Sequence, residues 1–389
     1  MRIVQVSEVA SINPRSDSIA PTEQISFVGM AQLDAQSAVA TPLDSRSFSS
    51  VSKGYTIFNN HDILAAKITP CWENGKIGEA SLTHPIGVGS TEFHVIRHGK
   101  SIDRRYLLHF LRRPEIRTAG QLRMTGSGGQ RRVPASFIKE LRIPLPPLDE
   151  QRRIAAILDQ ADAIRAKRHQ TLNHLESLPA AIFLKNFHED SHDEYTPLSN
   201  LADIASGITK GRRTSDPTRP VPYLAVYNVQ AGHLKMDFVK TINATTEEID
   251  RYSLHSGDLV LTEGGDPDKL GRGTVWRDEL PLCLHQNHIF RVRVRPDIPL
   301  HSDFLSAFMA SSTARKYFLR AAKQTTGIAS INMRQLRALP VRLPPITLQK
   351  LFVDELNKIN AQRSRVKAAL ARDDELFASL QSRAFKGEL

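Results

Sequence analysis

An internal duplication constrains the fold of this chain more than any other feature. The segment LRIPLPPLDEQRRI, from Leu141 to Ile154, returns as LPVRLPPITLQKLF, from Leu339 to Phe352, an offset of 198 residues. At the same offset Gln151 falls on Gln349 and Phe187 on Phe385. A period near 200 residues is the size of a domain rather than of a solenoid repeat. We therefore predict two domain-sized copies, each followed by its own helix.

The duplication extends upstream into both globular parts. With small insertions, HDILAAK at 61–67 matches GDLVLTE at 257–263, and ISFVGMAQL at 25–33 resembles VPYLAVYNV at 221–229. Short apolar runs bounded by Gly, Asn, Pro and Ser predict strands at 25–30, 62–68, 93–97, 258–262 and 289–294. Residues 103–111 and 302–310 have helical periodicity. Each globular part should therefore be a mixed α/β domain within an α+β chain.

Each Leu-Pro-Pro pair should end a domain, because consecutive prolines cannot continue a helix and extend the residue before them. Beyond each pair, apolar residues recur at heptad spacing. The predicted seam consists of Ile154, Leu158, Ile164, Leu172, Leu356, Ile359, Val366 and Leu370. Each helix should run for roughly 38 residues, or roughly 57 Å, with Pro179 near the end of the first. We expect the two helices to pair along these seams as a coiled coil; the alternative is that each packs only on its own domain.

Composition favours a polyanionic partner. The chain has 52 Lys and Arg against 41 Asp and Glu, a formal net charge of +11, which suits nucleic acid or simply maintains solubility. No apolar run could span a bilayer, and the N-terminus lacks the layout of a signal peptide, so a cytoplasmic protein is expected. Cys71 and Cys283 are far apart in sequence, and neither a disulfide framework nor a zinc site is expected.

The order of domain, LPPLDEQRRIAAIL helix, second domain, LPPITLQ helix and terminal AFKGEL resembles the specificity subunit of type I restriction-modification systems. The resemblance covers nearly the full length, with departures at Thr347-Leu348-Gln349 and at 185–188. It implies target-recognition domains at 1–145 and 191–343, separated by spacer helices at 146–190 and 344–389 that form an antiparallel coiled coil. Each domain would read one half of a split double-stranded DNA site. In this family the chemistry belongs to partners: two adenine methyltransferase subunits and ATP-dependent restriction (translocase) subunits.

The chain itself lacks catalytic motifs. It has no GxxxxGK[ST] phosphate loop, and its Pro-Pro pairs follow Leu rather than the Asn or Asp of an amino-methyltransferase. The segment DPDK at 266–269 lacks a second acidic element, and His285 and His288 lie in a strand-like run without further ligands. We therefore expect no catalytic residue, cofactor or metal. Two alternatives stay open: a recognition subunit of another restriction-modification class, with or without a hidden activity, and a protein-binding adaptor.

Candidate DNA contacts lie in polar loops beside the strands and before each Leu-Pro-Pro exit, since phosphates attract Lys and Arg while forked side chains read bases. The candidates are Lys67, Lys76, Gln130, Arg131, Arg132, Lys210, Arg212, Arg213, Lys269, Arg272, Lys323, Gln324, Asn332 and Arg334.

Overall fold

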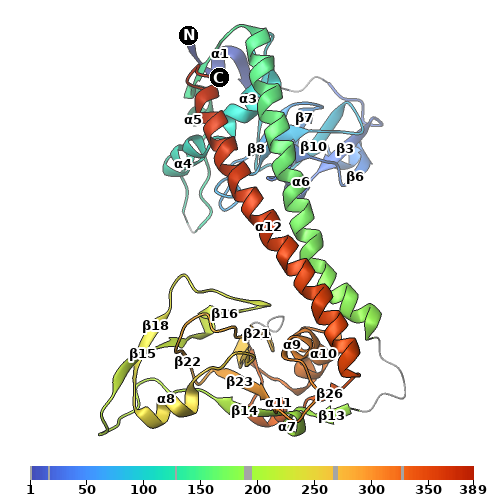
Figure 1. The fold of residues 1–389 in the computed structure, drawn as a ribbon. Coiled ribbons are helices and arrows are strands. Elements are labelled where there is room, and N and C mark those ends of the chain that lie inside the picture. The colour runs from blue at the N-terminus through green and yellow to red at the C-terminus, as the bar shows by residue number, and fades with distance from the viewer. Residues whose placement is uncertain (1, 16–17, 128, 188–194, 266–269, 326–327) are drawn as a thin grey trace. The chain divides into compact units, whose positions relative to one another are not determined.

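The computed structural model of the chain describes residues 2–15, 18–127, 129–187, 195–265, 270–325 and 328–389. It divides into two compact units (Figure 1). The first comprises Met1–Leu172 with Val366–Leu389, and the second comprises Asn173–Arg365. Each unit thus combines one globular part with portions of the two long helices, α6 (Leu148–Asn186) and α12 (Ile346–Ala384).

The first globular part contains two larger sheets and a small one. Their strand orders are β2-β11-β8-β9-β5-β4, β6-β3-β10-β7 and β1-β12. The strands are β1 (Ile3–Gln5), β2 (Ala10–Ile12), β3 (Gln24–Val28), β4 (Leu33–Asp34), β5 (Val39–Ala40), β6 (Asp44–Ser47), β7 (Thr56–Asn59), β8 (Ile63–Ala66), β9 (Ile77–Ala80), β10 (Ile86–Gly89), β11 (Phe93–His98) and β12 (Arg142–Pro144). The helices are α1 (Val6–Val9), α2 (Phe48–Val51), α3 (Arg104–Leu111), α4 (Pro114–Leu122) and α5 (Ala135–Glu140), with the 3-10 turn η1 (Met30–Gln32).

The second globular part shares the central part of this topology, since β14-β23-β19-β21 corresponds to β2-β11-β8-β9 and β18-β15-β22 to β6-β3-β10. Its sheets have the orders β14-β23-β19-β21, β18-β15-β22, β13-β26, β16-β17 and β20-β25-β24. The strands are β13 (Tyr195–Pro197), β14 (Ala202–Ser206), β15 (Arg219–Leu224), β16 (Val229–Gln230), β17 (His233–Leu234), β18 (Lys240–Ala244), β19 (Leu259–Thr262), β20 (Gly264–Gly265), β21 (Gly273–Val275), β22 (Leu284–His285), β23 (Ile289–Val294), β24 (Lys323–Thr325), β25 (Ile328–Ser330) and β26 (Pro340–Arg342). The helices are α7 (Leu198–Leu201), α8 (Thr246–Tyr252), α9 (Ser302–Met309), α10 (Ser312–Ala321) and α11 (Met333–Arg337), with the 3-10 turn η2 (Val226–Asn228).

A buried ion pair marks the same position in both globular parts. Asp62, which precedes β8, is 3% exposed and accepts hydrogen bonds of 2.9 and 2.7 Å from Arg97 of β11. Asp258 precedes β19, is 1% exposed, and accepts two bonds of 2.7 Å from Arg293 of β23. The predicted match between HDIL and GDLV is therefore confirmed in three dimensions.

In the first unit the two long helices run antiparallel. Arg165 of α6 pairs with Asp374 of α12 at 2.7 Å, and Arg168 pairs with Asp373, so the residue number rises on one helix as it falls on the other. The Arg165 guanidinium also lies 4.4 Å from the centroid of the Phe377 ring. Asp373, an acidic residue within the apolar pattern of α12, thus has its counter-charge on α6.

The end of each long helix closes a globular core. In the first unit the Phe385 ring, just after α12, lies 5.0 Å from that of Tyr106 on α3. In the second unit the Phe187 ring, just after α6, lies 4.9 Å from that of Phe304 on α9. Phe187 and Phe385 match at the offset of the duplication, as do Tyr106 and Phe304. Both cores therefore contain an aromatic residue delivered by the helix that starts at the other domain.

Most predicted seam residues are covered, and one is not. Ile154 and Leu158 are buried in the first core, whereas Leu172, Val366 and Leu370 are each 8% exposed. Leu356 and Ile359 are half-buried. Ile164, also assigned to the seam, is 45% exposed. At this level α6 faces α12 through the ion-paired Arg165 and Arg168, which turn Ile164 outward.

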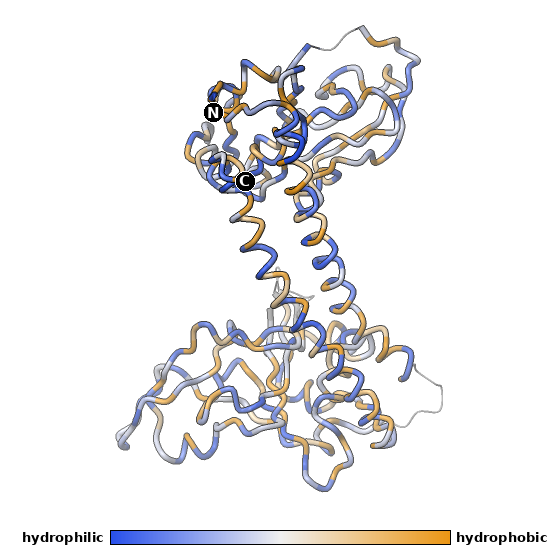
Figure 2. Tube along the Cα trace, turned by 45° about the horizontal axis from the view of Figure 1, so that its top comes forward, coloured by the Kyte–Doolittle hydropathy of each residue, from blue (hydrophilic) through white to orange (hydrophobic). Residues whose placement is uncertain are grey.

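The fold class is confirmed as two similar mixed α/β domains joined by two long antiparallel helices. Hydrophobic and hydrophilic residues alternate along α6 and α12 (Figure 2). Within the described part of the chain, no helix combines the length and apolarity that a bilayer crossing requires.

A fully buried glutamine fixes the start of each long helix. Gln151 accepts a hydrogen bond of 2.8 Å from the amide of Asp103 and donates to the carbonyl oxygens of Ser101 and Pro146 at 3.2 and 2.8 Å. Gln349 repeats these bonds with His301, Pro299 and Pro344 at 2.9, 3.0 and 2.7 Å. One amide side chain in each unit thus joins three segments of backbone.

We expect Gln151→Leu to lower the free energy of unfolding by roughly 2–3 kcal/mol, because an unpaired buried polar group costs roughly 1–3 kcal/mol. Urea titration of the full chain, followed by circular dichroism, measures the loss. The matched control is Gln160→Leu, at an exposed position of the same helix. Equal losses from both substitutions would show that the buried hydrogen bonds are not what fixes the helix.

Candidate nucleic-acid interface

Four polar residues gather where β8 and β11 approach the hairpin before α5, and we name Lys67, Lys76, Glu92 and Arg132 the first strand-end cluster. The backbone amide of Lys67 donates to the Glu92 carbonyl at 2.8 Å, and the Val133 amide donates to the Lys67 carbonyl at 2.8 Å. Arg132 binds the Glu92 carboxylate through Nε and Nη2 at 3.0 and 2.8 Å. This guanidinium lowers the pKa of Glu92.

Arg132 therefore serves the hairpin itself. Its Nη1 also donates to the Gln130 carbonyl at 3.2 Å, so all three nitrogens have protein partners. Arg131 and Gln130 are exposed, and Gly126 and Gly129 adopt positive φ angles of 124° and 77°, which favour glycine. Of the three candidates in this loop, Arg131 and Gln130 are better placed than Arg132 to bind a ligand.

The second strand-end cluster occupies the same backbone frame with other side chains: Glu263, Arg272, His288 and Ser330. The Glu263 amide donates to the His288 carbonyl at 3.0 Å, as Lys67 does to Glu92. The Glu263 carboxylate lies 2.7 Å from His288 Nδ1. Lys67 and Glu92 of the first cluster thus correspond to Glu263 and His288 of the second cluster.

Lys76 and Arg272 are equivalent but partly engaged. Their carbonyls accept bonds of 2.9 Å from Ala66 and Thr262 respectively. The Lys76 ammonium donates to the Met30 carbonyl at 2.8 Å, while Arg272 Nη1 donates to Gln230 at 3.2 Å. The buried Arg272 Nε has no partner among the described residues. Both side chains are half-buried, so they support the loops on which they lie.

The remaining candidates of the second unit differ in availability. Lys323 and Gln324 lie on β24, which pairs with β25. Asn332 caps α11 by accepting a bond of 2.9 Å from the Gln335 amide, and Arg334, two residues later, is exposed. Lys269, with the rest of DPDK, lies outside the described residues.

The GITKGRR loop supplies two exposed cations and one structural one. Arg212 pairs with Glu248, and its Nη2 also donates to the Asn243 carbonyl at 2.8 Å. The Arg212 guanidinium lowers the pKa of Glu248 to about 2. Lys210 and Arg213 are exposed, and the Lys210 ammonium lies 5.3 Å from the centroid of the Tyr223 ring.

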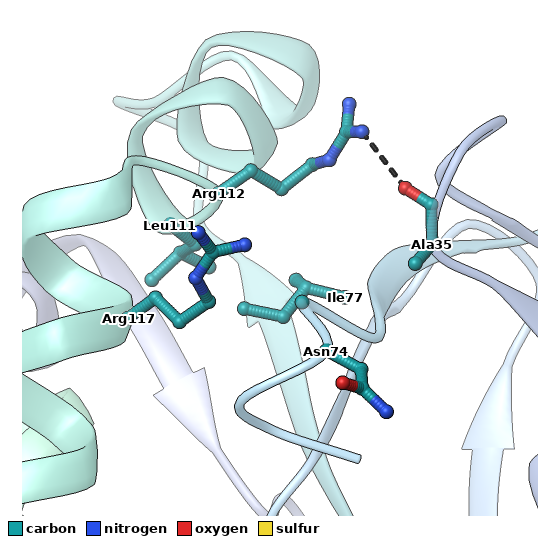
Figure 3. A pocket seen from close by; sticks show the side chains of 7 residues that line it. Ala35, Asn74, Ile77, Leu111, Arg112 and Arg117 are labelled. Carbon is teal, nitrogen blue, oxygen red and sulfur yellow. Dashed lines mark hydrogen bonds between the residues drawn. The ribbon is translucent and has the colours of Figure 1, made fainter. Parts of the chain in front are cut away.

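A small pocket of about 100 Å³ lies beside the first cluster, between the end of α3 and two loops (Figure 3). Arg112 donates to the Ala35 carbonyl at 3.0 Å and pairs with Asp162 of α6 at 2.7 Å. Arg117 faces the same space opposite Asn74 (Figure 3). The lining is basic, and the volume is too small for a nucleotide cofactor, since pockets for such ligands measure about 300 Å³ or more.

A polar contact that sequence reasoning missed ties the first domain to α6. Asp159 accepts a hydrogen bond of 2.6 Å from Arg105, and its Oδ1 lies 2.7 Å from Nε2 of the fully buried His109. Burial would raise the pKa of Asp159, but the bonds from His109 and Arg105 lower it to about 2. At the offset of the duplication the second unit has Ala307 and Asn357 in place of His109 and Asp159, so this contact belongs to one unit alone.

Burial strongly shifts the pKa of two further groups in the second unit. His285 is fully buried with Nδ1 3.0 Å from the Tyr252 carbonyl, and burial lowers the pKa of His285 to about 4. Burial raises the pKa of the Cys283 thiol to about 12. Among the described residues, no three His, Cys, Asp or Glu side chains gather as metal ligands do.

Comparisons with known proteins match this geometry. Residues 2–177 match the family described as "Type I restriction modification DNA specificity domain". The chain is 34% identical to the type I restriction enzyme EcoEI specificity subunit of Escherichia coli, over 89% of this chain and 75% of that protein. The chain belongs to the family of type I restriction enzyme specificity subunits.

Other members of this specificity-subunit family match over different shares. The EcoAI specificity subunit of Escherichia coli is 42% identical over 38% of this chain, which is 26% of that protein. The superposition on a chain of a solved type I restriction-modification system covers 100% of the present chain and 98% of the solved one. The TM-score is 0.58 and the sequence identity is 17%. That structural likeness supports the fold.

Stability should depend on pH through Asp159. Its pKa lies below the ordinary value of 3.8, so its contribution is complete above about pH 4 and is lost as pH falls toward about 2. Because the side chain is 35% exposed, we expect Asp159→Asn to cost only about 1 kcal/mol at pH 7. Urea titrations at pH 7 and pH 3 should show this difference shrinking on acidification.

Asp149→Asn is the control, since Asp149 is 96% exposed on the same helix. A loss from Asp159→Asn that stayed constant between pH 7 and pH 3 would contradict the assigned cause.

Proposed function

We propose that this chain is the non-catalytic DNA-specificity subunit of a type I restriction-modification enzyme. It reads a bipartite double-stranded site, with one half bound by each globular part. The observation that carries the proposal is that one backbone frame holds two different strand-end clusters. The shared backbone positions would let both globular parts dock on DNA in the same way. The different side chains would let the two parts bind half-sites of different sequence.

Side chains in and beside the strand-end clusters support base reading. Arg131 offers a forked donor that suits guanine, whereas Glu263 offers an acceptor that suits the exocyclic amine of cytosine. Each lies on a loop at the end of a sheet, where neighbouring backbone hydrogen bonds fix its position. The net charge of +11 supplies general attraction to phosphates.

The scaffold supports partners of matching symmetry. Two related surfaces on one chain suit two copies of one protein, so we assign two methyltransferase subunits to it. Restriction (translocase) subunits then join the assembly, which acts in the cytoplasm. All chemistry resides in these partners, and this chain uses no cofactor or metal.

Mapping N6-methyladenine in a genome that expresses the chain with its methyltransferase tests the proposal. We expect one motif of two short, unlike halves separated by an unread gap. Arg131→Gln should relax the first half alone and Glu263→Gln the second half alone. Each should lose roughly 5–150-fold in discrimination at one position, since a good base contact is worth roughly 1–3 kcal/mol.

Lys139→Gln, at an exposed position on α5, is the matched control and should leave the motif unchanged. A continuous motif, or methylation independent of this chain, would contradict the proposal and favour a recognition subunit of another class or a protein-binding adaptor.

A further inference from the structure

The helix that follows α3 in the first domain and α9 in the second carries exposed cations that the expected interface did not include. On α4 and its C-terminal end these are Arg117 and Arg123, and on α10 they are Arg315, Lys316 and Arg320. All five are exposed, and none of their side chains has an ion-pair or hydrogen-bond partner within the described ranges. Most arginines of the first unit, by contrast, are paired with a carboxylate or a carbonyl.

The exposed cations of α4 and those of α10 are related by the duplication. Arg117 and Arg315 match at the offset of 198 residues. The α10 sequence STARKYFLRA contains no acidic residue, and α10 contributes no exposed large hydrophobic side chain. Protein-docking surfaces need an apolar centre, so the exposed face of α10 fits a polyanion better than a protein.

Both helices lead directly into the predicted base-reading hairpins. The α4 helix ends at Leu122, three residues before Thr125, which bridges to Arg132 across the first hairpin. The α10 helix ends at Ala321, two residues before β24. A ligand held by either hairpin would therefore pass close to the adjoining row of cations.

Close packing fixes each helix against the loop that holds a cluster residue. In the first unit Trp72 Nε1 donates to the Arg117 carbonyl at 2.8 Å, and a Cβ on Gly120 would lie 2.3 Å from the Trp72 ring. In the second unit a Cβ on Gly271, beside Arg272, would lie 2.4 Å from the ring of Phe318 on α10. In the first unit the glycine lies on the helix and the aromatic ring on the loop, and in the second unit the two are exchanged. The close contact between glycine and ring is the same.

We propose that α4 and α10 bind the phosphodiester backbone beside each half-site, without regard to base sequence. Arg117 and Arg315 make equivalent contacts in the two halves, and Arg123, Lys316 and Arg320 extend them. Phosphate contacts of this kind set the position of a protein on DNA, while other groups read the bases. This inference rests on the proposed function and assigns the groups that hold the duplex in place.

The test uses the full chain assembled with its methyltransferase, and measures affinity across a range of salt concentrations. One duplex carries the mapped site, and the other has a scrambled sequence. The variants are Arg315→Gln/Lys316→Gln/Arg320→Gln and Arg117→Gln/Arg123→Gln. The control is Lys53→Gln/Lys100→Gln, two exposed lysines on other elements of the first unit.

Each phosphate contact contributes about 0.9 to the slope of log affinity against log salt. The triple variant should therefore lower that slope by about two to three and the α4 double variant by about two. Affinity for both duplexes should fall by the same factor, roughly tenfold or more at about 0.1 M salt. The preference for the mapped site and the methyltransferase content should not change, and the control should match the wild type.

Three results would overturn the inference while the proposed function stands. These are unchanged slopes in the variants, a changed base preference, or an equal fall in the control. Loss of methyltransferase from the variant complexes would instead assign these helices to protein docking. If the wild-type complex itself showed no salt-dependent preference for the mapped site, the proposed function would fail.

Discussion

The hydrogen bonds of two buried glutamines determine how each domain is attached to a helix. Gln151 and Gln349 join the first turn of α6 and α12 to the segment before α3 and α9 and to the Leu-Pro-Pro exit. An amide is suited to this position because it donates twice and accepts without carrying charge, so full burial leaves no ion unpaired. The same three bonds in both units give the two domains the same relation to the helix that leaves them.

The opposite ends of the helices complete the arrangement. Phe187 and Phe385 place an aromatic ring in a core that is otherwise built mainly from one globular part. Large aromatic rings supply much of the apolar area that such cores bury. Each core therefore contains side chains from both long helices.

The two units differ at the strand ends and at the helix contact. Lys67 and Glu92 are replaced by Glu263 and His288 on an unchanged backbone pattern. The contact of Asp159 with Arg105 and His109 has no counterpart in the second unit, where Asn357 and Ala307 lie at the matching positions. The first domain is therefore held on α6 by directional, charge-assisted bonds that the second domain lacks.

The duplication, the two long helices and the α+β class could be predicted from sequence because they depend on periodicity and composition. Which individual side chains are free to bind DNA could not be predicted in this way. Arg132, Arg212 and Asn332 are residue types that bind DNA, yet they are bonded within the protein to Glu92, Glu248 and the Gln335 amide. These partners lie in turns or distant segments whose proximity has no periodic signal.

The same limit applies to the long helices and to the cations outside the predicted loops. Ile164 satisfies the heptad pattern but is 45% exposed, and the neighbouring Arg165 and Arg168 pair with the aspartates of α12. The cations of α4 and α10 were overlooked because solvated helix faces commonly carry such residues. The packing of Trp72 and Phe318 and the short connections to the two hairpins tie these helices to the predicted interface.

The central claim is that each globular part reads its half-site independently on a shared frame. The most direct measurement is a methylation map of a chimera in which residues 1–142 are exchanged for another first recognition domain, with Gln151 and Phe385 retained. The account predicts that one half of the motif changes while the other half and the gap remain as in the wild type. A simultaneous change in both halves would contradict it.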